Sequence, residues 1–178
     1  EQRASANSKA AVAATQPSEG FVGRAPLLAR LAEQLAGCAE GRTRVCALVG
    51  EAGIGKSRTA REVMAWAAAR GMATASAVCM SGEGTPAFWP WYQLLRAACG
   101  DAEVLVEGGS GQGPHARWLL FDEVTRRLAE AATPSGLTLL IDDLQWADEP
   151  SLRLLSFFVQ HVVDAPLLVL VTSRRSDG

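Results

Sequence analysis

A glycine-rich run that ends in lysine and serine is the clearest chemical feature of this sequence. Residues 50–57 have the form Gly-x-x-x-x-Gly-Lys-Ser, between an apolar run at 45–49 and a helix-compatible segment that ends at Gly71. Glycines in the run let the backbone turn tightly and aim its N–H groups inward, and the next helix adds the positive end of its dipole. Lys56 can reach β- and γ-phosphates, and the Ser57 hydroxyl can bind Mg²⁺. The pattern predicts a loop that binds a nucleoside triphosphate.

Two consecutive acids follow another apolar run. Residues 137–141 predict a buried strand, and Asp142 and Asp143 come directly after it. A phosphate-loop site needs a carboxylate on an adjacent strand to hold the Mg²⁺ shell, and we assign this role to Asp142. Asp143 is then placed to orient or deprotonate an attacking water. Taken alone, two acids after a strand are also typical of a helix cap or a turn.

An arginine lies beyond the last apolar run. Residues 167–172 predict a strand, and Arg174 follows it. A guanidinium at the end of a strand beside a nucleotide can contact the γ-phosphate with a bidentate fork. The alternative is a solvated arginine, because Arg175 is its neighbour.

The remaining pattern alternates helices and strands. We expect a helix from Pro26 that ends at Gly37, a weak strand at 72–78, a loop from residue 82 that leads into a short helix near residues 94–98, and helices at 115–132 and 151–163. Asp148 and Pro150 are expected to start the last helix, and residues 108–113 to form a flexible connection. Apolar strands without polar alternation predict an α/β fold with a parallel sheet covered on both faces. Its ligand should lie at the carboxyl ends of the strands.

Composition excludes several functional classes. The chain has 178 residues, 48% of them hydrophobic and 20% charged, with a net charge of −2, which is ordinary for one globular domain and does not favour nucleic acid or anionic lipid. No apolar stretch is long enough to span a bilayer, so we expect a cytoplasmic protein without a membrane partner. The cysteines have no metal-ligand spacing and are expected to be reduced. Trp89, Trp91, Trp118 and Trp146 are expected to be packing residues rather than a base-stacking platform. Residues 1–18 are interpreted as a mobile linker, and residues 19–178 as the nucleotide-binding domain.

Four segments together resemble the nucleotide-binding domain of STAND-type ATPases, the signal-transduction relatives of the AAA+ ATPases. Within that class the chain looks like the ATP-binding domain of large bacterial transcriptional regulators of the LuxR type. The segments are Phe21–Arg24, Gly50–Arg58, Leu140–Asp148 and Val171–Arg174. The resemblance covers about residues 19–175 and implies a P-loop NTPase three-layer sandwich, cut before its last strand and its lid.

The resemblance implies an adenine nucleotide as ligand, with ATP or ADP setting the state of a switch that slow hydrolysis resets. Self-association through the ATPase domain is the other partner interaction considered. Lys56 and Asp143 are the implied catalytic residues, and Ser57 and Asp142 the implied Mg²⁺ residues. The implied nucleotide contacts, with the first three beside the adenine, are Phe21, Val22, Arg24, Gly50, Ala52, Gly53, Ile54, Gly55, Lys56, Ser57, Arg58 and Arg174.

The chain departs from the family pattern in two respects. Ala25 stands where an acid commonly follows Gly-Arg, and the chain ends before the expected fifth strand, the lid and any DNA-reading element. We therefore expect weak nucleotide binding, negligible hydrolysis and no specific DNA binding by this chain alone.

Two alternatives remain beside the regulatory ATPase. A small-molecule phosphotransferase would require an acceptor pocket and a basic lid, whereas Leu144, Gln145 and Trp146 follow the paired acids. A purely structural domain would require a damaged phosphate loop, and this loop is intact.

Overall fold

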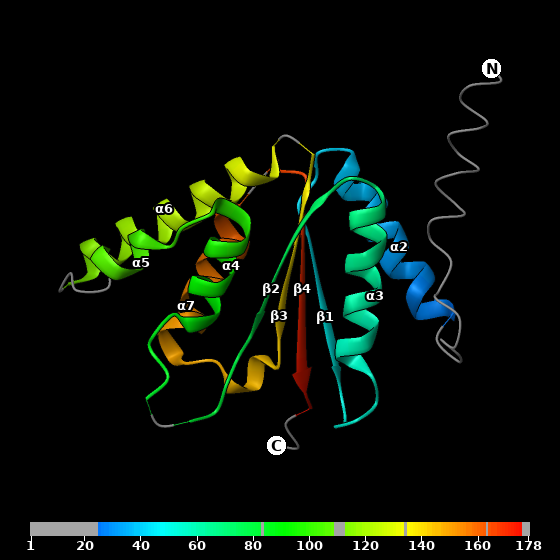
Figure 1. Cartoon of the computed structure of the whole chain (residues 1–178), viewed down its shortest axis with the longest axis horizontal. Coiled ribbons are helices and arrows are strands. Elements are labelled where there is room, and N and C mark those ends of the chain that lie inside the picture. The colour runs from blue at the N-terminus through cyan, green and yellow to red at the C-terminus, as the bar shows by residue number, and fades with distance from the viewer. Residues whose placement is uncertain (1–24, 83, 109–112, 134, 163, 176–178) are drawn as a thin grey trace.

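Four parallel strands form the centre of the molecule (Figure 1). The computed structural model describes residues 25–82, 84–108, 113–133, 135–162 and 164–175. The predicted linker at 1–18 lies outside these residues, as do Phe21, Val22 and Arg24. The strands are arranged in the order β1-β4-β3-β2, and each neighbouring pair is parallel. Their bounds are Arg44–Gly50 for β1, Ala73–Val78 for β2, Leu137–Asp142 for β3 and Leu167–Arg174 for β4.

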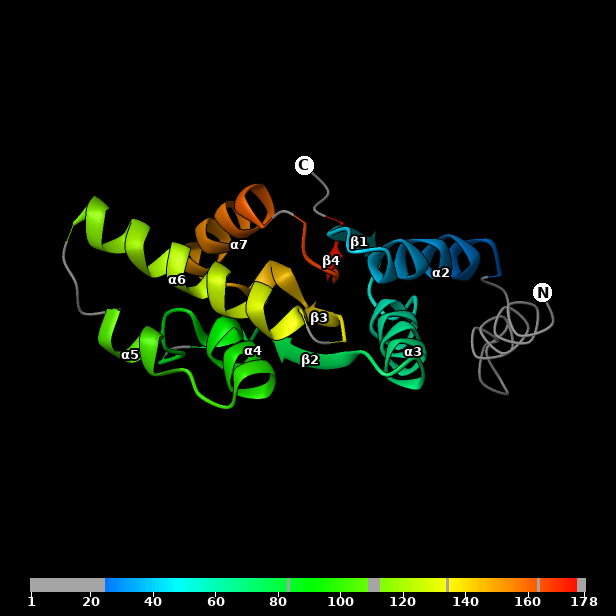
Figure 2. The ribbon, with the colours of Figure 1, turned by 90° about the horizontal axis from the view of Figure 1, so that it is seen from above.

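Helices cover both faces of this sheet, as the sequence predicts. In Figure 2, α2 and α3 lie on one side and α4 to α7 on the other. Each side has its own buried cluster, one around Leu35, Val63 and Leu170, the other around Trp91, Leu128 and Phe158. The helices are α2 (Ala25–Ala39), α3 (Lys56–Ala69), α4 (Trp89–Cys99), α5 (Glu103–Gly108), α6 (Pro114–Ala132) and α7 (Glu149–His161), with a 3₁₀ turn, η1 (Leu144–Trp146). The α/β three-layer prediction is confirmed.

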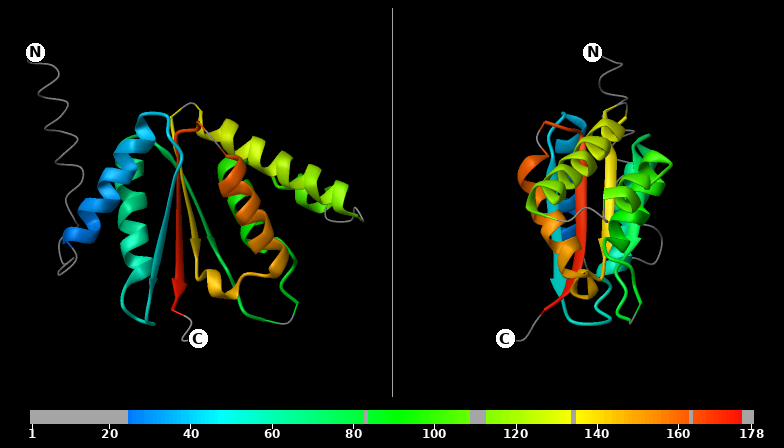
Figure 3. Two further views of the ribbon diagram at one scale, coloured as in Figure 1. Left: turned by 180° about the vertical axis from the view of Figure 1, so that it is seen from behind. Right: turned by 90° about the vertical axis from the view of Figure 1, so that its left-hand side faces the viewer.

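The carboxyl ends of the strands meet at one end of the molecule. The arrowheads point the same way in both views of Figure 3. Gly50, Asp142 and Arg174 are the last residues of β1, β3 and β4. The sequence therefore predicts correctly where these three residues converge.

The first helix runs beyond its predicted end. The sequence analysis ends it at Gly37, but α2 continues to Ala39 and a turn follows it at Gly41, whose φ is +82°. A left-handed glycine is the usual residue after a helix, so Gly41 takes the role assigned to Gly37. Gly37 instead makes room for a side chain, because a Cβ there would lie 3.2 Å from Arg44 Nε.

The strand before the phosphate loop is less buried than predicted. Val45 and Val49 are 44% and 60% exposed, whereas every residue of β3 is buried. Among the described strands, β1 pairs only with β4, so it lies at an edge. An apolar run does not distinguish an edge strand from a central one, which explains the error.

Two further segments differ from their predictions. Helix α4 starts at Trp89, with Pro90 in its first turn, where the sequence analysis still expects a loop. The short helix α5 was not predicted and lies against α6. The predicted flexible connection at 108–113 falls mostly on residues 109–112, which lie outside the described part of the chain.

The cysteines and tryptophans follow their predictions in part. The four cysteines are all unpaired, in agreement with reduced thiols. Trp91 is buried and packs against Phe158, and Trp118 packs edge-on against Phe157 although it is 50% exposed, whereas Trp146 is 43% exposed. No helix of the described residues is long and apolar enough to cross a membrane.

Two buried threonines on neighbouring strands give a test of the core. Thr138 on β3 and Thr172 on β4 are both fully buried. The Thr138 hydroxyl has no hydrogen-bond partner among the described residues, whereas the Thr172 hydroxyl contacts Asp142 and the Asp143 N–H. We expect Thr138→Val to raise the free energy of unfolding by about 1 kcal/mol, and Thr172→Val to lower it by roughly 1 to 3 kcal/mol. Urea denaturation measures both values, and an equal loss in the two variants would contradict the assignment.

Candidate functional site

The phosphate loop joins the end of β1 to the start of α3. Gly53 and Gly55 have φ values of +74° and +91°, a conformation that side-chain-bearing residues rarely adopt. Gly55 is also the N-cap of α3 and offers no side-chain cap, so the first N–H groups of the helix are available to an anion. Gly50 does not have a positive φ, and a Cβ there would make only an ordinary 3.6 Å contact with Ile54. The predicted need for glycine thus holds for the backbone at residues 53 and 55.

Lys56 folds back over the loop. Its Nζ donates hydrogen bonds to the carbonyl oxygens of Gly50, at 2.9 Å, and of Glu51, at 2.8 Å. The ammonium group therefore lies against the two residues at which the loop leaves β1. A positive charge held there, beside the start of α3, creates a site for an anionic group.

The Asp142 carboxylate connects three elements of the site. Its Oδ1 accepts a hydrogen bond from Ser57 Oγ at 2.7 Å and another from Thr172 Oγ1. Its Oδ2 lies 3.4 Å from Arg61 Nη2, on the next turn of α3. The residue is only 4% exposed, and these partners compensate the loss of water around its charge. The structure thus brings together Ser57 and Asp142, the two residues predicted to support Mg²⁺.

The chemistry of this pair fits Mg²⁺. The Ser57 hydroxyl donates its hydrogen to Asp142, which leaves its lone pairs for a cation. Mg²⁺ prefers oxygen ligands and usually keeps several waters or phosphate oxygens in its shell. Within the described residues no three His, Cys, Asp or Glu side chains form a metal-binding group. A metal at Ser57 and Asp142 therefore depends on oxygen atoms from a nucleotide and from water.

Asp143 has a strained backbone beside this cluster. Its φ of 60° and ψ of 47° lie in the left-handed region, which is rare for residues other than glycine. Its N–H donates to Thr172 Oγ1 at 2.9 Å, and its Oδ1 accepts from Gln145 Nε2 at 2.9 Å. Asp143 is half-buried, so its carboxylate is more accessible to water than that of Asp142.

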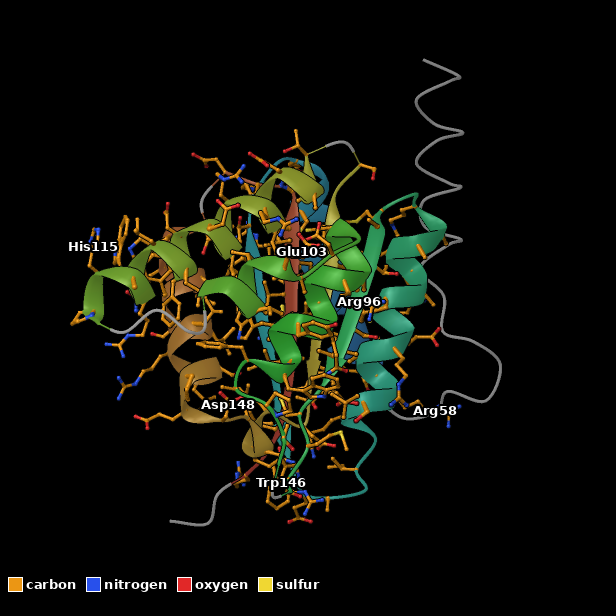
Figure 4. The ribbon with its side chains drawn as sticks, turned by 60° about the vertical axis from the view of Figure 1, so that its left-hand side comes forward. Arg58, Arg96, Glu103, His115, Trp146 and Asp148 are labelled. Atoms are coloured by element: carbon orange, nitrogen blue, oxygen red, sulfur yellow. The ribbon has the colours of Figure 1, made fainter. Side chains whose placement is uncertain are left out.

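Arg174 lies at the exposed end of β4. The strand register pairs it with Gly50, and the N–H of Arg175 donates to the Gly50 carbonyl at 3.3 Å. The Arg174 guanidinium lies over the Trp146 ring, 5.8 Å from the ring centroid. Trp146 is labelled at the carboxyl ends of the strands in Figure 4. The predicted γ-phosphate contact is thus beside the phosphate loop.

An apolar cleft opens next to the same loop. It has a volume of about 320 Å³ and is lined by Leu27 of α2, by Val49 and by Ile54, among others. Ala52 and Arg58 are exposed, and Figure 4 shows Arg58 on the outer side of α3. Phe21, Val22 and Arg24, predicted beside the adenine, lie outside the described residues.

Three residues of the site were missed by the sequence analysis. Thr172, Gln145 and Arg61 contact the paired acids through side chains from β4, η1 and α3. Thr172 had a visible signal, since it interrupts the apolar run 167–171 at the end of a strand. The other two have no signal of their own, because their contacts depend on where the chain folds.

Cys79 borders the site without the reactivity of a nucleophile. Burial raises the pKa of its thiol to about 12, and the negative charges of Asp148, Asp143 and Asp142 act in the same direction. The thiol is therefore neutral at ordinary pH. Asp148 itself caps α7 as predicted, accepting from the Ser151 N–H at 2.9 Å.

A comparison with protein families agrees with this geometry. The family model described as the AAA ATPase domain matches residues 20–170, which is most of the chain. A comparison with curated proteins found no match. The phosphate loop, the acid at the end of β3 and the strands β1, β2 and β3 lie within the matched residues, which end inside β4. The chain belongs to the AAA ATPase domain family, whose members are nucleotide-binding ATPase modules.

Proposed function

We propose that this chain is the ATP-binding switch module of a signal-transduction ATPase, in a transcriptional regulator that hydrolyses ATP slowly and with Mg²⁺. The observation that carries the proposal is the contact of Ser57 with Asp142 and of Asp142 with Thr172. These contacts connect the phosphate loop to β3 and β4. The nucleotide site and the sheet are therefore connected through one buried carboxylate, that of Asp142. The transcriptional context is supported by the four sequence segments that resemble regulators of the LuxR type.

In this proposal, each part of the nucleotide contacts a different group of site residues. The phosphates lie on the N–H groups of residues 50–57 with Lys56 at the β- and γ-phosphates, and the base lies in the cleft beside Leu27 and Ile54. Ser57 and Asp142 hold Mg²⁺, which supplies charge neutralisation for the phosphates when bound. Asp143 orients the attacking water, and Arg174 contacts the γ-phosphate.

The alternative is a small-molecule phosphotransferase, and one observation favours it. A cavity of about 220 Å³ lies beyond the carboxyl ends of β2 and β3, lined by Cys79, Thr85 and Trp146, among others. Its described lining contains no lysine or arginine, so it does not supply the basic residues that would stabilise a phosphoryl group during transfer to an acceptor. We therefore favour the switch, in which ATP is hydrolysed and no acceptor is required.

Adenine nucleotides should stabilise the folded chain. ATP with Mg²⁺, or ADP, at about 100 times its dissociation constant adds roughly 2.7 kcal/mol to the free energy of unfolding, or about 5 to 10 °C in Tm for a chain of this size. GTP should stabilise it less. Differential scanning fluorimetry measures the shift. A folded sample whose Tm does not respond to saturating ATP would exclude the proposed function.

Lys56→Ala should remove most of the Tm shift caused by ATP. The variant loses the charge that faces the β- and γ-phosphates, whereas its own stability should change little because, among the described residues, the hydrogen bonds of the side chain are to two carbonyls at the start of the loop. Arg153→Ala is the matched control, since Arg153 is an exposed cation that pairs with Glu149 on α7, away from the phosphate loop. Equal ATP affinities in Lys56→Ala and in the parent would contradict the assignment.

Asp142→Asn and Asp143→Asn should have different effects. The first variant should make ATP binding independent of Mg²⁺, because the Mg²⁺ shell loses its supporting charge. The second should bind ATP as the parent does and hydrolyse it more slowly, by roughly 100-fold or more. Calorimetric titrations with and without Mg²⁺ measure binding. Hydrolysis is measured in single-turnover assays on a longer chain that includes the lid, because we expect this chain alone to hydrolyse ATP negligibly, at well below about 1 per second. An equal loss of ATP affinity in both variants would refute the separate roles assigned to Asp142 and Asp143.

A further inference from the structure

Gln145 joins Asp143 and Arg174, the residues to which the proposed function assigns the attacking water and the γ-phosphate. Its Nε2 donates to Asp143 Oδ1 at 2.9 Å, and its Oε1 accepts from the backbone N–H of Arg174 at 3.0 Å. Both ends of one amide group are therefore occupied by residues of the candidate site. Since an N–H must face the carboxylate and an oxygen must face the backbone N–H, the amide has only one orientation that satisfies both contacts.

The Gln145 side chain continues the pairing of β3 with β4 beyond the end of β3. The register of the two strands stops at Ile141 and Val171, while β4 runs on to Arg174. Beyond this point, hydrogen bonds to two side chains replace the missing strand pairing. Thr172 Oγ1 accepts from the Asp143 N–H, and Gln145 Oε1 accepts from the Arg174 N–H. The end of β4 is thus held in place by the turn that follows Asp143.

The turn that carries Gln145 is itself well defined. Asp143 is in the left-handed region, and its carbonyl accepts from the Trp146 N–H at 2.9 Å, which closes η1. Trp146 lies under the Arg174 guanidinium. The turn therefore contacts Arg174 twice, once at its backbone through Gln145 and once at its side chain through Trp146.

We propose that Gln145 is a positioning residue for ATP hydrolysis, which fixes the Asp143 carboxylate relative to the end of β4 that carries Arg174. This inference rests on the proposed function, because it assumes that Asp143 orients the attacking water. The position of a catalytic carboxylate must be held closely for full activity, and a hydrogen bond from a half-buried amide supplies that restraint. Gln145 acts through Asp143 and the end of β4, so it influences the rate of hydrolysis more than the affinity for ATP.

Two variants separate the two contacts of Gln145. Gln145→Met keeps an unbranched side chain of similar length and loses both hydrogen bonds. Gln145→Glu keeps an oxygen for the Arg174 N–H and, when ionised, has no hydrogen to donate to Asp143. Both should bind ATP with Mg²⁺ within about twofold of the parent and lower the single-turnover rate constant by about tenfold or more.

Gln93 provides a matched control. Its amide also contacts the end of a strand at two points, accepting from the Val78 N–H at 3.3 Å and donating to the Val78 carbonyl at 3.1 Å. These contacts are on β2 and do not include a residue of the proposed catalytic set. Gln93→Met should lower Tm and leave the single-turnover rate constant within about twofold of the parent at a temperature where the variant is folded.

The decisive measurement is a double-mutant cycle with Asp143→Asn. If Gln145 acts through Asp143, Gln145→Met should slow the parent but should not slow Asp143→Asn any further. Additive losses, an unchanged rate in Gln145→Met, or a loss of ATP affinity as large as the loss of rate would each overturn the proposal. If Gln145→Met does not fold, Gln145→Glu takes its place in the same cycle with Asp143→Asn, and the same result is expected.

The outcomes for the parent chain separate this proposal from the proposed function. A folded parent that does not bind ATP overturns the proposed function itself. A longer, lid-containing parent that binds ATP without measurable single-turnover hydrolysis overturns the role of Gln145 and leaves nucleotide binding intact. A parent that binds and hydrolyses ATP, with Gln145→Met unaffected, overturns only the positioning role.

Discussion

The buried carboxylate of Asp142 is the contact on which the rest of the site depends. A charge that is only 4% exposed is costly unless polar partners replace the water that it loses. Two hydroxyl groups and one guanidinium supply those partners here, and they come from α3 and β4. Any movement of the phosphate loop that shifts Ser57 therefore alters the surroundings of a buried charge. This coupling is the physical reason for proposing a switch, since a change in the loop would alter contacts on β3 and β4 together.

Adjacent acids at the end of β3 have different environments because the strand ends between them. Along a strand, successive side chains point to opposite faces, so an extended Asp143 would face away from Asp142. The left-handed backbone at Asp143 ends the strand and removes this constraint. Asp142 stays in the sheet among its hydroxyl donors, while Asp143 enters the turn and contacts Gln145. The Asp142 carboxylate is thereby suited to charge compensation, and the Asp143 carboxylate to contact with water.

Local pattern was sufficient to predict the positions of the strand ends and of the loop. Gly53 and Gly55 were predictable because only glycine adopts their backbone conformation readily, and Asp148 because a cap contact is made within three residues along the chain. Gly37 and Val49 were misjudged for a different reason. Whether a glycine makes room for an arginine, or a valine lies on an edge strand, depends on which segments become neighbours. The family resemblance covered the loop and the acids, but it did not supply these contacts.

The same distinction explains why Thr172 and Gln145 were not predicted as site residues. The sheet places β4 between β1 and β3, so the last strand of the described chain lies between the phosphate loop and the paired acids. Chain order alone places β4 furthest from β1. Once β4 is in the centre, a hydroxyl at Thr172 can contact both acids, and Gln145 can reach the backbone at Arg174. The strand order therefore turns three separate sequence motifs into one hydrogen-bonded site, in which β4 provides the connection.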